Sequence, residues 1–136
     1  MKVDGRCHCG AISFEADVDP AMSRICHCTD CQTISGSAFR TVVQVPEADF
    51  RVLTGEPKIY IKTAESGNKR AQGFCGDCGT ALFATSANGD GPKVYGLRLG
   101  ALSQRDQLPP KGQVWTRSAQ PWVGDLANIP GLEKQS

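Results

Sequence analysis

The chain has little that points to a membrane, to nucleic acid or to an oxidising compartment. None of its apolar runs approaches the ~20 residues that a membrane-spanning helix needs, and the N-terminus, MKVDGRCHCG, has no hydrophobic signal region. Its charges almost cancel, with 15 Lys and Arg against 14 Asp and Glu. Neither nucleic acid nor an anionic membrane is therefore predicted as a partner. We expect a cytoplasmic protein.

Signals for helix are also scarce. Eight prolines limit helix in many segments, and only Thr29–Ser35 (TDCQTIS), followed by Gly36, has the form of a helical turn. Strand signals predominate, as short β-branched or alternating runs bounded by turn residues. The predicted strands are Ala11–Ala16, Phe39–Val45, Phe50–Leu53, Lys58–Lys62, Ala81–Thr85 and Val94–Leu99. The sequence therefore predicts an all-β or β-dominated chain.

The length predicts a single domain. A chain of 136 residues can bury a modest core, but core burial alone leaves a domain of this size only marginally stable. Metal ligation is a natural supplement to such a core. We expect a zinc-binding β domain over residues 1–126 and a frayed C-terminal tail over residues 127–136.

Cysteine is the residue type with an unusual arrangement. All seven cysteines fall into close clusters, Cys7-x-Cys9, Cys26-x-Cys28-x2-Cys31 and Cys75-x2-Cys78. An odd number of cysteines in a reducing compartment does not fit a disulfide framework, and the βαβ context of a redox Cys-x2-Cys pair is missing. Cysteines that serve only as small buried apolar residues have no reason to cluster. The spacing therefore indicates zinc sites with thiolate ligands.

Seven ligands make one complete site and leave three cysteines over. We expect a closed structural zinc site and an open catalytic zinc site, and thus two zinc ions per chain. The structural set is Cys7, Cys9, Cys75 and Cys78, and the catalytic set is Cys26, Cys28 and Cys31. One alternative stays open, in which Cys28 and Cys31 pair with the last Cys-x2-Cys. The gap between those pairs is longer than the ~15–20 residues usual in zinc ribbons.

Local geometry suggests how each motif would hold an ion. On a strand, a Cys-x-Cys pair points both sulfurs to one face, so we expect the central His8 and His27 to face away from the metal, with direct ligation as the alternative. The Cys-x2-Cys motif lies in a glycine-rich turn, CGDCG, which can curl around the ion.

The segments around the cysteines resemble the glutathione-dependent formaldehyde-activating enzyme family, which also contains centromere protein V. They are CHCGAISFE (Cys7–Glu15), CHCTDCQTISGSAF (Cys26–Phe39) and FCGDCGTALF (Phe74–Phe83). The resemblance spans about residues 4–123 and is closest to compact members. It implies several small coiled antiparallel sheets around zinc sites, a fold shared with methionine sulfoxide reductase B and zinc-containing Rab exchange factors. It also implies the same structural and catalytic sets of cysteines.

This resemblance and the open three-cysteine site predict a zinc-dependent carbon–sulfur lyase, or an enzyme that forms thiol–aldehyde adducts. The substrate would be a small thiol such as glutathione, or its S-hydroxymethyl adduct. Three thiolates leave zinc electron-rich, so a soft substrate thiol suits the fourth position better than hydroxide does. Two alternatives stay open, namely a non-enzymatic zinc module that binds a protein partner, and a zinc store or redox sensor.

Other residues are candidates for roles around the open site. Three of them follow Cys31 closely and are expected to approach it, unless the segment is simply a turn that enters a strand: Gly36, Ser37 and Phe39. Three arginines are candidate carboxylate ligands that the sequence alone does not place: Arg24, Arg40 and Arg98. Two tryptophans are expected in the core or, second, in the wall of a pocket: Trp115 and Trp122.

Overall fold

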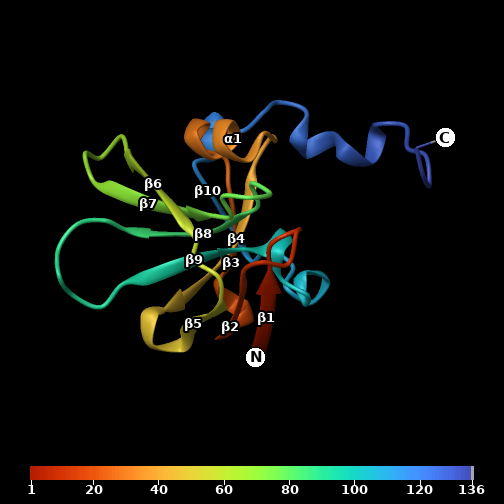
Figure 1. Ribbon diagram of the computed structural model, residues 1–136. Helices are drawn as coiled ribbons and strands as arrows, with labels where there is room; N and C mark the ends of the chain where they lie inside the picture. The colour runs from red at the N-terminus through yellow and green to blue at the C-terminus, as the bar shows by residue number, and fades with distance from the viewer. Residues whose placement is uncertain (136) are drawn as a thin grey trace.

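The computed structural model describes residues 1–135 and is dominated by β-strands (Figure 1). The strands are β1 Lys2–Arg6, β2 Ser13–Asp17, β3 Ser23–Cys26, β4 Arg40–Pro46, β5 Phe50–Thr54, β6 Lys58–Thr63, β7 Lys69–Phe74, β8 Ala81–Ser86, β9 Val94–Arg98 and β10 Gly112–Val114. One α-helix occurs in the described chain, α1 Thr29–Ser35. Short 3-10 helices cover η1 Pro20–Met22, η2 Glu47–Asp49, η3 Leu99–Ala101, η4 Arg105–Gln107, η5 Thr116–Ser118 and η6 Val123–Asn128. The prediction of a β-dominated chain is confirmed.

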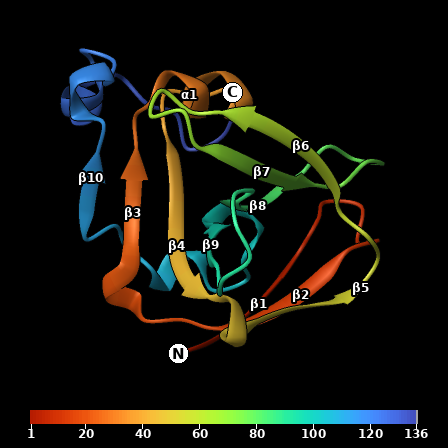
Figure 2. The same cartoon turned by 90° about the vertical axis from the view of Figure 1, so that its left-hand side faces the viewer.

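The strands form two sheets (Figure 2). The small sheet has the order β1-β2-β5, and the large sheet has the order β10-β3-β4-β9-β8-β7-β6. The pairs are antiparallel except for β10 and β3, which run parallel. The helix α1 follows β3 at one end of the large sheet, where Figure 2 also shows the end of β6. Within residues 1–135, no helix is both long and apolar enough to cross a membrane.

The hydrophobic core lies between the two sheets. Val43 of β4 is paired with Leu97 of β9, and Leu97 is paired with Phe83 of β8, so one face of the large sheet is apolar. The ring of Phe50 in β5 lies edge-on to Phe14 of β2 at 5.7 Å and to Phe83 at 5.6 Å. Edge-to-face aromatic contacts at this distance are favourable. They join the small sheet to the large one, which leaves the opposite face of the large sheet free for other functions.

A glycine is required where the ring of Phe14 crosses β1. Gly5 is the direct partner of Phe14 in the β1–β2 register, and the Phe14 side chain is almost fully buried. A Cβ atom at Gly5 would overlap the ring of Phe14. The close packing therefore depends on the missing side chain, rather than on a special backbone angle.

Gly5→Ala is expected to lower the free energy of unfolding by about 1–3 kcal/mol, because overpacking a core forces rings and backbone to shift. The matched control is Gly91→Ala, since no atom lies within 4 Å of a Cβ built there. The control should change stability by no more than ~0.5 kcal/mol. Urea denaturation of both variants checks this, and equal midpoints would show that the core accommodates the methyl group.

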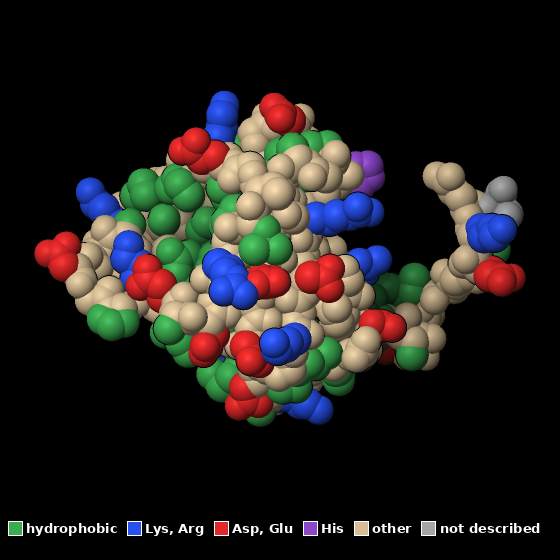
Figure 3. Space-filling model, turned by 60° about the horizontal axis from the view of Figure 1, so that its bottom comes forward, with side chains coloured by type: hydrophobic (Ala, Val, Ile, Leu, Met, Phe, Trp, Pro, Cys, Tyr) green, Lys and Arg blue, Asp and Glu red, His purple; other side chains and the backbone are tan. Residues whose placement is uncertain are grey.

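The C-terminal segment, which contains η6, extends away from the body of the domain (Figure 1). Its apolar side chains are largely exposed, with 50% for Leu126 and 76% for Leu132. The tail predicted over residues 127–136 begins at the end of η6, and its last residue, Ser136, lies outside the described residues. On the face in Figure 3, acidic and basic side chains are interspersed, as the near-zero net charge leads one to expect.

Candidate metal centres

The structure gathers the seven cysteines into two clusters. Within each cluster the Sγ atoms all lie within 4.8 Å of one another, so each cluster could hold a metal ion. The four-cysteine cluster contains Cys7, Cys9, Cys75 and Cys78, and the three-cysteine cluster contains Cys26, Cys28 and Cys31. These are the two sets expected from the sequence. The alternative, in which Cys28 and Cys31 pair with Cys75 and Cys78, is wrong, because Cys28 and Cys31 lie beside Cys26.

The four-cysteine cluster lies between connections that belong to different sheets. Cys7 and Cys9 follow β1 of the small sheet, whereas Cys75 and Cys78 lie between β7 and β8 of the large sheet. The Sγ–Sγ distances are 3.6 Å for Cys7–Cys9 and 3.8 Å for Cys9–Cys75. Tetrahedral thiolates around zinc lie about 3.8 Å apart. An ion bound here would therefore tie the two sheets together.

The expected strand geometry of the first motif is wrong, because the chain turns after β1. Cys7 accepts a hydrogen bond on Sγ from the Ile12 amide at 3.2 Å, and the Gly10 amide donates to the Cys7 carbonyl at 3.0 Å. This turn brings both sulfurs to one side, as strand alternation was expected to do. The His8 side chain is exposed, and its backbone amide donates to Thr80 Oγ1 at 2.9 Å.

The second pair lies in a tight knuckle, as the glycine-rich turn predicted. The Gly79 amide donates to the Cys75 carbonyl at 2.8 Å, and Gly79 has a φ of +79°. This left-handed conformation is readily available to glycine. Cys78 Sγ lies 3.2 Å from Thr80 Oγ1. Thr80 therefore contacts both halves of the cluster, since it also accepts the His8 amide.

The three-cysteine cluster is built by the junction of β3 and α1. Cys26 is the last residue of β3, Cys28 is the N-cap of α1, and Cys31 lies in its first turn. The Cys31 amide donates to Cys28 Sγ at 3.2 Å, so the cap itself holds one sulfur in place. The prediction of a helix over Thr29–Ser35 that ends at Gly36 is confirmed, with Gly36 at a φ of +64°.

Two thiols of this cluster are joined by a hydrogen bond. The Cys31 thiol donates to Cys26 Sγ at 3.4 Å. This hydrogen bond lowers the pKa of Cys26 to about 5, although burial opposes the shift, and the charge of Arg40 contributes to it. The same hydrogen bond raises the pKa of Cys31, and burial adds to this shift. The hydrogen bond therefore favours the thiolate form of Cys26, which is the form that binds a soft metal ion.

His27 is directed away from the three-cysteine cluster and is buried. Its Nε2 atom lies 2.7 Å from Oε1 of Gln113, and its ring is edge-on to Phe39 at 5.6 Å. Gly36, Ser37 and Phe39 are not among the residues that line the cavity beside the cluster. The structure therefore does not place them in the cavity wall, and Phe39 packs against His27 instead.

A cavity of about 360 Å³ adjoins the three-cysteine cluster, whose three residues form part of its wall. Five cationic side chains also line it: Arg24, Arg40, Lys62, Arg70 and Arg98. The pairing of the strands explains why the cysteine and several of these cationic side chains lie together. Cys26 is paired with Arg40, and Val42 is paired with both Arg24 and Arg98. Since alternate residues share a face of a sheet, the cysteine and these arginines project from the face opposite the core.

The two tryptophans are not core residues, so the first expectation for them is wrong. Trp115 is 42% exposed and Trp122 is 47% exposed. Trp115 lines the cavity and was correctly considered as a pocket wall. It has a φ of +58°, which is rare for a residue with a side chain, and the guanidinium of Arg117 lies 4.9 Å from its ring centroid. Such backbone strain is common beside functional sites.

Gln32 holds the segment that carries Trp115 beside the cluster, and no sequence motif points to this role. Its Nε2 donates to the carbonyl oxygens of His27 at 2.8 Å and Ser118 at 2.9 Å. Its Oε1 accepts a hydrogen bond from Gln120 at 2.8 Å. One side chain thus connects α1, the start of the cluster and the C-terminal segment.

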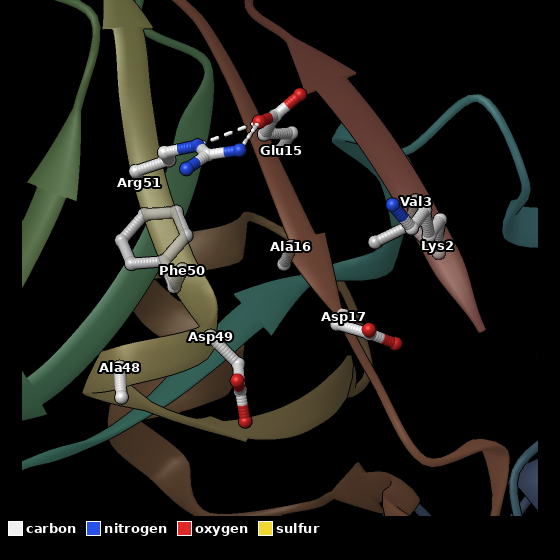
Figure 4. A pocket seen from close by; sticks show the side chains of 9 residues that line it. All are labelled: Lys2, Val3, Glu15, Ala16, Asp17, Ala48, Asp49, Phe50 and Arg51. Carbon is white, nitrogen blue, oxygen red and sulfur yellow. Dashed lines mark hydrogen bonds and ion pairs between the residues drawn. The ribbon is translucent and has the colours of Figure 1, made fainter.

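A second cavity lies on the small sheet (Figure 4). No cysteine is among the described residues that line it, and three of its charged side chains already have partners. Glu15 forms an ion pair with Arg51, and Asp17 accepts a hydrogen bond from the N-terminal amine at 3.1 Å. This cavity is therefore a weaker candidate for a functional site than the cavity beside the three-cysteine cluster.

The fold and the two thiolate clusters define a β-dominated domain that could bind two metal ions. Within that class, the chain belongs to the glutathione-dependent formaldehyde-activating enzyme family, whose family model matches residues 2–118. A curated Halomonas elongata protein that is named after this activity is 30% identical over 87 residues, which are 61% of this chain and 55% of that protein. The chain thus matches about half the length of this relative.

A solved structure shows the same fold. The crystal structure of a Rhodobacter sphaeroides protein superposes with a TM-score of 0.63 at 22% sequence identity. The superposition covers 82% of this chain and 99% of that chain. The arrangement of two sheets is therefore shared with a protein of low sequence similarity.

Proposed function

We propose that this chain is a zinc-dependent enzyme that makes or breaks a carbon–sulfur bond between a small thiol and an aldehyde. In this proposal the three-cysteine cluster holds the catalytic zinc, and the four-cysteine cluster holds the structural zinc. The observation that carries it is that the cluster with an open position forms part of a cavity wall. The family description names glutathione and formaldehyde, which supports glutathione, or the S-hydroxymethyl adduct that the two would form, as the proposed substrate. A reducing cytoplasm would keep the seven thiols available.

The donor sets fit zinc. All seven ligands are thiolates, which are soft ligands that zinc accepts, and the measured Sγ–Sγ distances of 3.4–3.8 Å are close to tetrahedral spacing around zinc. Four ligands close a structural site, whereas three protein ligands and one free position are usual for a catalytic site.

When bound, zinc would stabilise the substrate sulfur as a thiolate at neutral pH. The cysteines fix the position at which that sulfur binds, and the cavity wall orients the rest of the substrate. In the forward direction the sulfur bonds to the carbonyl carbon, and the thiol proton ends on the carbonyl oxygen. The reverse direction breaks the same bond and returns the aldehyde and the thiol.

A second candidate is a non-enzymatic zinc module that binds a protein partner. It is favoured by the edge strand β6, where Ile59, Tyr60 and Ile61 are 51%, 56% and 47% exposed. Apolar side chains on an unpaired sheet edge are typical of surfaces that bind another chain.

Cobalt substitution separates the two candidates. We expect millimolar glutathione to change the visible spectrum of the Co²⁺-loaded chain and to add a sulfur-to-cobalt charge-transfer band. The matched control is S-methylglutathione, which cannot form a thiolate and should leave the spectrum unchanged. If neither glutathione nor other small thiols alter the spectrum, thiol binding is ruled out and the partner-binding module is the better description.

A further inference from the structure

Two buried arginines share one neutral acceptor in the wall of the cavity beside the three-cysteine cluster. Arg40 is 5% exposed and Arg98 is 8% exposed. Arg40 Nη1 donates to Gln72 Oε1 at 3.1 Å, and Arg98 Nη2 donates to the same oxygen at 2.9 Å. Burial and the charge of Arg40 lower the pKa of Arg98 to about 9. Within residues 1–135, neither Arg40 nor Arg98 forms an ion pair, and the acceptor that they share is neutral.

The two guanidinium groups also have unused donors. Within residues 1–135, Nε and Nη2 of Arg40 and Nε of Arg98 are buried without a hydrogen-bond partner. Nε and Nη2 form one edge of a guanidinium, and that edge can bind a carboxylate through two parallel hydrogen bonds. Buried donors without partners are costly, so the site would gain from a ligand that accepts these bonds.

The rest of the cavity does not neutralise these charges. Among residues 1–135, no Asp or Glu lines it. Asp30 lies nearby, but it pairs with Lys62 at 2.9 Å. A three-thiolate zinc site has one net negative charge. This charge and Asp30 together account for only two of the five cationic side chains in the wall.

We infer that Arg40 and Arg98 form a subsite for the carboxylate of a small substrate that binds at the three-cysteine cluster. This inference deepens the proposed function and rests on it. Arg40 is the direct partner of Cys26 across β3 and β4, and such partners have Cβ atoms about 4.5–5.5 Å apart. The preferred substrate class is therefore a mercaptocarboxylate, with its carboxylate only a few bonds from its sulfur, or the aldehyde adduct of such a thiol.

A carboxylate without a thiol tests the subsite alone. At constant ionic strength, propionate should raise the melting temperature of the zinc-loaded chain in a saturable manner, and the neutral propionamide should not. Gln72→Glu places a carboxylate between the two arginines, so this variant should stay folded and lose the response to propionate. The subsite is overturned if propionamide matches propionate, if Gln72→Glu retains the response, or if inorganic phosphate gives the larger shift.

Thiols then connect the subsite to the proposed function. We expect 3-mercaptopropionate to bind the Co²⁺-loaded chain about 10–100-fold more tightly than 2-mercaptoethanol, because charge-assisted hydrogen bonds add to the sulfur contact. Gln72→Glu should remove this preference but keep binding of 2-mercaptoethanol. Equal binding of both thiols overturns the subsite and leaves the proposed function intact. If neither thiol binds, the proposed function fails, and the response to propionate alone decides the subsite.

Discussion

Cys78→Ser is expected to lower the melting temperature of the zinc-loaded chain by on the order of 10–20 °C. Cys78 belongs to the β7–β8 connection, while two other ligands of its cluster follow β1 in the other sheet. A metal ion at this position constrains segments that are far apart in the chain, and its binding energy is therefore folding energy. Loss of one ligand weakens the metal-mediated connection between the sheets and leaves their apolar packing in place.

The matched control is Cys28→Ser in the three-cysteine cluster. Its ligands lie within one short segment between β3 and α1, so an ion there closes only a small loop. We expect a loss of metal from that site and a decrease in melting temperature of only a few degrees.

Calorimetry and metal analysis of reduced protein check both variants. Wild type should contain two zinc ions, and after chelation the two variants and wild type should melt at similar temperatures. Equal shifts from both substitutions, or a single ion in wild type, would contradict the assignment of one structural and one catalytic site.

The two cysteine clusters that could hold metal ions were predicted because each cysteine motif is local in sequence. Each motif places two or three sulfurs within a few residues, and α1 carries both its N-cap, Cys28, and its left-handed Gly36 in the sequence. Six strands were also predicted, since β2, β4, β5, β6, β8 and β9 contain β-branched or alternating apolar runs. Their ends differ from the prediction by one or two residues, as is usual for strand boundaries.

The missed strands are short or polar, and they depend on their neighbours. β1 (KVDGR) and β7 (KRAQGF) contain glycine and charged residues, which have low strand propensity. β1 forms because Gly5 admits the ring of Phe14, and β7 forms between β6 and β8. Tertiary packing therefore overrides the local preference in both strands.

The cationic cavity could not be predicted because it depends on register. Arg40 and Arg98 are 58 positions apart in the chain, yet pairing of β4 with β9 places them on one face. Gln72 lies on a third strand, β7, and no sequence motif identifies it as a partner of these arginines. Composition showed only that arginines were available, whereas the order of the large sheet decides which of them meet.

Gln72 is the site of the second large effect. We expect Gln72→Leu to lower the free energy of unfolding by about 3–5 kcal/mol, because it removes one acceptor from two buried cations. Arg40 Nη1 and Arg98 Nη2 both donate to Gln72 Oε1, and leucine of similar volume offers no replacement. The loss should exceed that of an ordinary hydrogen bond, because both guanidinium groups remain buried with their charge.

Gln44→Leu is the matched control for this change. Gln44 also lines the cavity, on β4, and its side chain makes no hydrogen bond within residues 1–135. Stability should change by no more than ~0.5 kcal/mol. Denaturant unfolding of the zinc-loaded variants measures both, and Gln72→Glu should restore the stability that Gln72→Leu loses, since a carboxylate can accept from both arginines. If Gln72→Leu is as stable as Gln44→Leu, the charge of the two arginines is balanced by another group, and the three-thiolate zinc site is the first to test.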